Sequence, residues 1–275
     1  MKPPAGNSVQ TAMDGVFEVL FPTIVQLFAW CALVVGTRAA STAWPPENNY
    51  TGLFRARWTV AGAGLLCGCL WGFDAMNSLM VFTLISHGTK LYPLLDISRC
   101  LEAIPSVVIL YVVLRRERLR EVFGIRCGIK TWLWTLSSFV ILLGVSIGGW
   151  SLDSMRGISE QSVRPILRQA GPYRALWSIF MVGLVTPATE EVLYRGVVLD
   201  SLRRAVSSKL GSVMCATLFA AAHAGSLFAT LSYLCSGLIL NSLRDRYDSL
   251  LPAFLVHVAI NALLMVGANV AGPPY

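Results

Sequence analysis

The chain of 275 residues contains 55% hydrophobic but only 13% charged residues, with 22 Lys and Arg against 15 Asp and Glu. Soluble globular domains carry about 25% charged residues, so this composition excludes a water-soluble domain, because it leaves too little polar surface. The apolar residues fall into long blocks, and about 20 apolar residues in a row can span a bilayer as a helix. We therefore expect an integral membrane protein.

Eight apolar blocks follow one another along the chain, separated by glycine, proline and charged residues. They span residues 16–36, 58–82, 97–114, 131–150, 175–199, 206–223, 226–243 and 249–268. None alternates with period two, as the strands of a membrane β-barrel do, whereas a helix satisfies its own backbone hydrogen bonds within lipid. The sequence therefore predicts an all-α fold, a polytopic bundle of about eight transmembrane helices.

The first block, residues 16–36, could also be a signal peptide. Its apolar core is longer than the roughly 7–15 residues of a signal peptide, and Lys2 is the only positive charge before it. The small residues of TRAAST would nevertheless permit cleavage. We expect a retained helix and keep the cleaved signal as the alternative.

Basic residues cluster in alternate connections between the blocks, as the positive-inside rule requires. They follow the first, third, fifth and seventh blocks: Arg38, Arg55, Arg57, Arg115, Arg116, Arg118, Arg120, Arg126, Lys130, Arg203, Arg204, Lys209, Arg244 and Arg246. Four arginines after the fourth block depart from this scheme: Arg156, Arg164, Arg168 and Arg174. We interpret the net charge of +7 as a sign of membrane topology, and expect the lipid bilayer, not nucleic acid, as a partner.

The fifth block contains three ionisable residues, Glu190, Glu191 and Arg195. A charge at the centre of a bilayer costs roughly 2.5–3.5 kcal/mol, so each group needs a partner or a function. Glu191 and Arg195 lie four positions apart and can pair on one helix face. Glu190 points about 100° away from Glu191 and lacks an obvious partner. Pro187, which has no N–H, is expected to kink or loosen this helix.

Two of the three histidines also lie in apolar blocks, His223 in the sixth and His257 in the eighth. Asn261 follows His257 by four positions and shares its helix face. A single histidine on an apolar face is usually a packing residue. Glutamate, histidine and asparagine together, however, are the groups that activate water and stabilise an oxyanion. Since ionisable residues within a membrane indicate function, we predict a site formed by these residues and Glu190.

Three short motifs occur in order on successive blocks: EEVLYR at 190–195, FAAAH at 219–223 and HVAIN at 257–261. This order resembles the CPBP family of membrane proteases, also called the Abi or CAAX-protease family and including Rce1-like enzymes, whose motifs are E-E-x-x-x-R, F-x-x-x-H and H-x-x-x-N. The resemblance divides the chain into N-terminal transmembrane helices of unassigned family at 1–170, a CPBP-like catalytic transmembrane core at 171–268 and a short tail at 269–275.

The resemblance implies a glutamate-dependent intramembrane endopeptidase without a cofactor. Glu190 matches the general base that activates a water molecule, and His223 matches the histidine that helps to hold this water. His257 and Asn261 match the pair that stabilises the oxyanion. Glu191 and Arg195 match structural positions, in agreement with the ion pair expected from their spacing.

The resemblance also implies a protein or peptide substrate in the membrane. Eukaryotic members of the family cleave after a prenylated cysteine, while prokaryotic members are associated with bacteriocin maturation, immunity or processing of membrane-anchored tails. The substrate is therefore expected to be membrane-associated, either C-terminally lipidated or membrane-anchored. The arginine-rich, lysine-poor loops favour a multi-pass protein of the bacterial cytoplasmic (inner) membrane.

Three alternatives stay open. A zinc-dependent protease would use Glu190 and both histidines as ligands, although the sequence lacks H-E-x-x-H. A membrane scaffold, immunity protein or carrier would use the same polar groups to hold its bundle or a ligand. A serine protease would depend on Ser146 in GVSIG, which lies inside an apolar block without the preceding strand that the G-x-S-x-G motif requires.

Overall fold

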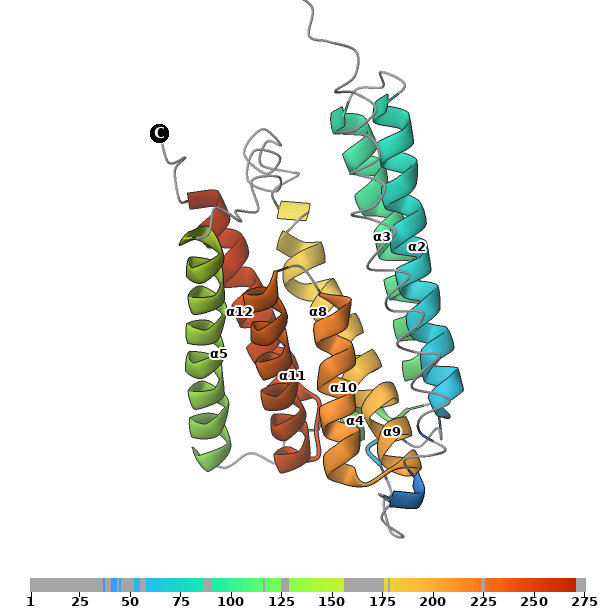
Figure 1. Ribbon diagram of the computed structural model, residues 1–275, viewed down its shortest axis with the longest axis vertical. Coiled ribbons are helices and arrows are strands. Elements are labelled where there is room, and N and C mark those ends of the chain that lie inside the picture. The colour runs from blue at the N-terminus through green and yellow to red at the C-terminus, as the bar shows by residue number, and fades with distance from the viewer. Residues whose placement is uncertain are drawn as a thin grey trace, which may run out of the picture.

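The computed structural model of the protein describes residues 58–86, 91–115, 117–124, 129–155, 179–223 and 226–270, with short pieces at 37, 41–43, 45, 52–54, 176 and 177. Every regular element in these ranges is a helix, and they contain no strand. The predicted all-α fold is therefore confirmed for this part of the chain. Figure 1 shows most of the long helices running roughly side by side.

The elements follow one another in the order in which the apolar blocks occur. They are α2 (Val60–Ser86), α3 (Leu91–Leu114), the single turn α4 (Leu119–Val122), α5 (Ile129–Met155), η1 (Met181–Val185), α8 (Thr186–Glu190), η2 (Glu191–Val198), α9 (Leu199–Ala205), α10 (Ser208–Ala222), α11 (Leu227–Tyr247) and α12 (Leu251–Val270). The segments η1, α8, η2 and α9 join without a break into one helix, in which two π-helical stretches, η1 and η2, flank the short α8. We call it the composite helix.

Every predicted block from 58–82 onwards coincides with a helix. The block at 16–36 lies outside the described residues, as does the choice between a retained helix and a signal peptide. α3 begins at Leu91, earlier than predicted, because Pro93 fits the first turn of a helix, where its missing N–H costs nothing. The turn α4 lies in a basic connection, where apolar patterning predicts no element.

Two described helices are long and apolar enough to cross a membrane, at Trp132–Gly149 in α5 and at Leu227–Tyr247, which is α11. Shorter apolar stretches lie at Val60–Phe73, Ala103–Leu114, Ser208–Ala222 and Leu251–Leu264. Large apolar side chains of α3 and α5 are exposed, including Val108, Tyr111, Leu136 and Ile141. Such faces suit a lipid environment. The count of eight transmembrane helices stays a prediction.

The composite helix lies inside the bundle. α2 and α3 stand together at one edge and α5 stands at the opposite edge, with α10, α11 and α12 between them (Figure 1). The composite helix contacts α2 and α3 on one side and α10 and α12 on the other, while α11 packs against α5 and α10. The predicted site residues therefore lie on helices at the centre of the fold, not on its outer faces.

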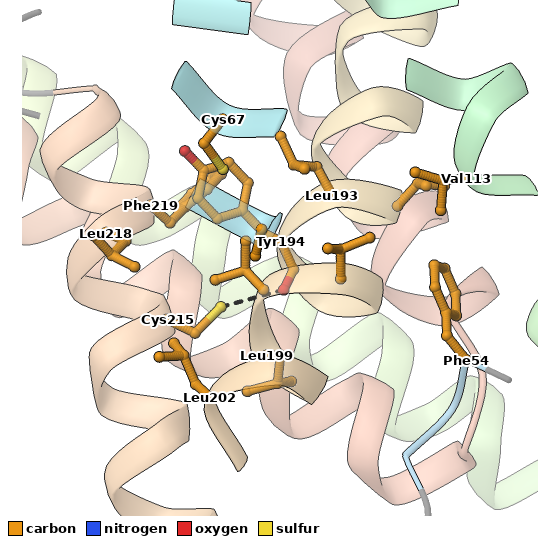
Figure 2. Packing of buried hydrophobic residues seen from close by; sticks show 14 of the residues in the cluster. Phe54, Cys67, Val113, Leu193, Tyr194, Leu199, Leu202, Cys215, Leu218 and Phe219 are labelled. Carbon is orange, nitrogen blue, oxygen red and sulfur yellow. Dashed lines mark hydrogen bonds between the residues drawn. The ribbon is translucent and has the colours of Figure 1, made fainter. Parts of the chain in front are cut away.

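The largest cluster of buried apolar side chains surrounds the second half of the composite helix. Leu193, Tyr194 and Leu199 are fully buried there, against Cys67 of α2 and Phe219 of α10 (Figure 2). The thiol of Cys215 donates to the carbonyl oxygen of Tyr194 at 3.3 Å, which ties α10 to η2. This packing holds the segment that carries Glu191 and Arg195 in one place.

Gly196 allows the N-terminal segment to reach the composite helix. Phe54 is buried with its ring against Gly196, and a Cβ atom at position 196 would lie 2.2 Å from Phe54 Cζ. A side chain of any size would displace this ring. Glycine at 196 is therefore required for close packing one residue after Arg195.

Asp200, which is fully buried in α9, fixes the same segment by hydrogen bonds. Its Oδ2 accepts from the backbone N–H groups of Leu53 at 2.8 Å and Phe54 at 3.0 Å. Arg244 of α11 pairs with its Oδ1. One carboxylate thus connects residues 52–54, the composite helix and α11.

The substitution Gly196→Ala should destabilise the protein, because the added methyl group overlaps the Phe54 ring. Overpacking of a buried site costs about 1–3 kcal/mol, so the thermal unfolding midpoint in detergent should fall by several degrees. The matched control is Gly68→Ala in α2, where an added Cβ meets no heavy atom within 4 Å. An unchanged midpoint for Gly196→Ala would contradict the packing described here.

Candidate active site

The composite helix presents Glu190 and Glu191 at the junction between α8 and η2. Within η1 the N–H of Thr186 bonds the carbonyl oxygen of Met181, five residues back. In the same register the next donor, at position 187, would bond Val182, but Pro187 has no N–H. The carbonyl oxygen of Val182 accepts a hydrogen bond from Asn261 of α12. Pro187 therefore removes one backbone donor just before the two glutamates, while the helix continues through it from α8 into η2.

The structure brings Glu190 together with both predicted histidines. Glu190 Oε1 lies 3.4 Å from His223 Nε2, at the end of α10, and Glu190 Oε2 lies 3.5 Å from His257 Nε2 in α12. The three side chains are 13%, 23% and 10% exposed, respectively. Neither distance is a short hydrogen bond. Each oxygen of the glutamate thus faces one imidazole nitrogen at a separation that leaves the carboxylate available.

Glu191 and Arg195 form the ion pair that their spacing predicts. Arg195 Nη1 donates to Glu191 Oε1 at 3.0 Å, and neither side chain is exposed. The same Oε1 lies 2.7 Å from His257 Nδ1. This second contact, between helices 66 positions apart in the sequence, is not predicted by the local spacing. Glu191 therefore contacts both its structural partner and a proposed catalytic residue.

His223 is held by its own helix and by a neighbouring ring. Its Nδ1 lies 2.8 Å from the carbonyl oxygen of Phe219, one turn earlier in α10. A carbonyl only accepts hydrogen bonds, so Nδ1 carries the proton and Nε2 faces Glu190. On one face the imidazole stacks against Tyr233 of α11, with ring centroids 4.3 Å apart. Sequence reasoning missed Tyr233, because nothing in its local pattern distinguishes it from other aromatic residues.

Phe219 connects the polar residues of the site. Its ring lies below the Arg195 guanidinium, with 4.3 Å between Cζ and the ring centroid, which is a cation–π distance. The ring also meets His257 edge-on, with centroids 6.0 Å apart. The phenylalanine of the F-x-x-x-H motif therefore packs against the arginine of the first motif and the histidine of the third.

Asn261 lies one turn beyond His257 on α12. Its Nδ2 donates to the carbonyl oxygen of Val182 in η1 at 3.1 Å. The amide has two N–H groups, so this bond orients the side chain and leaves a second donor. Asn261 thus joins α12 to the composite helix on the N-terminal side of Glu190.

The described residues contain no group of three or more His, Cys, Asp and Glu side chains arranged to hold a metal ion. Ser146 lies half-buried in α5, and no histidine is among its hydrogen-bond partners in the described part of the chain. The arrangement that the structure does provide is the largely buried carboxylate of Glu190 between two oriented imidazoles. Such a group can take a proton from water and return it to a leaving group.

Comparison with protein families matches residues 172–263 to the type II CAAX prenyl endopeptidase Rce1-like family. The matched segment contains the composite helix, α10, α11 and most of α12, and so every residue of the site described above. Comparisons with curated proteins and with solved structures gave no significant match. The three motifs and this match therefore support an Rce1-like segment of the CPBP family at residues 172–263.

Proposed function

We propose that the protein is an intramembrane endopeptidase that hydrolyses a peptide bond of a membrane-associated protein by glutamate-activated water. The observation that carries this proposal is the placement of Glu190 between His223 Nε2 and His257 Nε2, at 3.4 Å and 3.5 Å. The family supports a protease that acts in a membrane. The identity of the base and the attacking water are our inference from the geometry.

The hydrolytic water would bind between Glu190 and His223. One of its protons hydrogen-bonds to the Glu190 carboxylate and the other to the Nε2 lone pair of His223, which directs an oxygen lone pair toward the substrate carbonyl. On attack, the water oxygen bonds the carbonyl carbon and Glu190 takes the proton. Glu190 then gives this proton to the amine as the C–N bond breaks, so no acyl-enzyme forms.

The carbonyl oxygen becomes an oxyanion and needs donors on the opposite side from the attacking water. The Nε2–H of His257 and the remaining N–H of Asn261 lie next to one another on α12 and would supply them. A single donor of this kind typically contributes about 100–1000-fold to kcat. The oxyanion would thus form beside α12 and the proton transfers would occur beside α10.

The substrate class follows from the surroundings of the site. The exposed apolar faces of α3 and α5 suit a bilayer around the bundle, and we infer that the substrate reaches the site from the membrane. We propose a C-terminally lipidated or membrane-anchored protein or peptide as the substrate. We further propose that the protein spans the bacterial cytoplasmic membrane several times, with residues 171–268 as its catalytic core.

Glu190→Gln should slow cleavage strongly, because the amide has the shape of glutamate but cannot accept the proton. General-base catalysis contributes about 100–10,000-fold, so kcat should fall by that range. Comparing membrane peptides from cells that express the wild type or the variant would identify the substrate. Purified protein in vesicles would then give kcat for the cleaved peptide.

The matched control is Glu121→Gln, the same chemical change at an exposed glutamate of α4 that pairs with Arg118. It should cleave like the wild type. Full cleavage by Glu190→Gln would refute the glutamate mechanism. A scaffold or carrier would instead be supported by two results together. The cellular phenotype would stay unchanged in Glu190→Gln, and it would be lost in Glu191→Ala because that variant misfolds.

Chelation separates the proposed mechanism from a zinc-dependent one. Cleavage by the purified protein should persist after prolonged treatment with a chelator, since the proposed steps use only side chains and water. Loss of cleavage on chelation, with recovery on adding zinc, would contradict the metal-free proposal. Glu190→Gln loses most of its activity under either mechanism, so only the chelator distinguishes the two.

A further inference from the structure

The His257 ring lies between two carboxylates on the composite helix. Its Nδ1 is 2.7 Å from Glu191 Oε1, while its Nε2 is 3.5 Å from Glu190 Oε2. The edge-on contact with Phe219 limits rotation of the ring. The two nitrogens thus have different partners: one makes a short hydrogen bond, and the other faces the reaction centre.

The partners of Glu191 determine which nitrogen carries a proton. Arg195 is always protonated in proteins and lies 3.0 Å from the same Oε1, and both side chains are fully buried. Glu191 beside this cation is a carboxylate, and a carboxylate only accepts hydrogen bonds. The short contact to His257 therefore requires a proton on Nδ1. An unconstrained imidazole could carry it on either nitrogen.

The two histidines of the site are anchored by acceptors of different strength. Both present Nε2 to Glu190, but His223 is anchored by the neutral carbonyl of Phe219 and His257 by the charged Glu191. Hydrogen bonds to an ionised partner are roughly twice as strong as neutral ones. His257 is therefore the more firmly oriented ring, and its orientation comes from a side chain that mutation can change.

We propose that Glu191, anchored by Arg195, is a positioning residue that holds a proton on Nδ1 of His257, so that Nε2 faces the reaction centre and donates to the oxyanion through a second proton. Glu191 thus does more than pair with Arg195, because it affects the reaction through His257. Its effect on cleavage rests on the proposed protease function, but the position of the proton does not. The two can therefore be tested separately.

Nitrogen-15 solid-state NMR of the full chain in lipid, labelled at histidine, tests the proton position directly. The chain has only three histidines, so the His257 signals are assigned by their loss in His257→Asn. We expect a protonated Nδ1 in the wild type and a shift toward the Nε2–H form in Glu191→Ala. A wild-type His257 with an unprotonated Nδ1 would overturn the proposal, even if Glu191→Ala does not fold.

The activity test uses Glu191→Gln, which keeps the shape and removes the charge. We expect kcat to fall by about 10–100-fold, typical of the loss of a carboxylate that orients a functional histidine, with KM unchanged. Glu121→Gln again serves as the control that keeps wild-type kcat. A folded Glu191→Gln with wild-type kcat, while Glu190→Gln is strongly slowed, would refute the positioning role alone. Wild-type activity in Glu190→Gln would refute the proposed function and leave the NMR result standing.

Discussion

The site depends on the buried ion pair between Glu191 and Arg195. Both side chains are fully buried, and removing one partner from such a pair typically costs about 3–5 kcal/mol, because the other charge is left without compensation. Each side chain neutralises the charge of the other, and a helix inside the bundle could not otherwise tolerate either charge. Since Glu191 is engaged by Arg195 and His257, its neighbour Glu190 is the carboxylate that points to both imidazoles. The protein thus places two adjacent glutamates in different environments on one helix.

The irregular helix explains how these environments arise. π-helical segments are often found at functional sites. Here η1 and η2 flank α8, which ends at Glu190, and η2 begins with Glu191. The carbonyl oxygen of Val182 in η1 accepts from Asn261, so the composite helix also orients a donor on α12. The close packing of Phe54 on Gly196 and the bonds of Asp200 to the 52–54 segment secure the other end of the composite helix. The same helix is therefore fixed by the packing of the core and carries the glutamates of the site.

Much of this arrangement could be predicted from the sequence. Long apolar blocks specify helices because lipid leaves the backbone no other partner, and the fourfold spacing of Glu191 and Arg195 specifies their pairing. The approach of Glu190 to His223 followed from the resemblance to a known family, not from spacing. Contacts between helices distant in the chain could not be predicted, because periodicity describes one helix at a time. The bond of Glu191 to His257 and the stacking of Tyr233 on His223 belong to this class.

The central claim is that Glu190 and His223 activate one water molecule together. A double-mutant cycle of Glu190→Gln and His223→Asn, measured on kcat for the peptide that the wild type cleaves, tests it most directly. Groups that act as a unit have strongly non-additive effects, so the second substitution should cost little once the first is present. Effects on ln kcat that simply add would show that the two residues act independently, and would contradict the account.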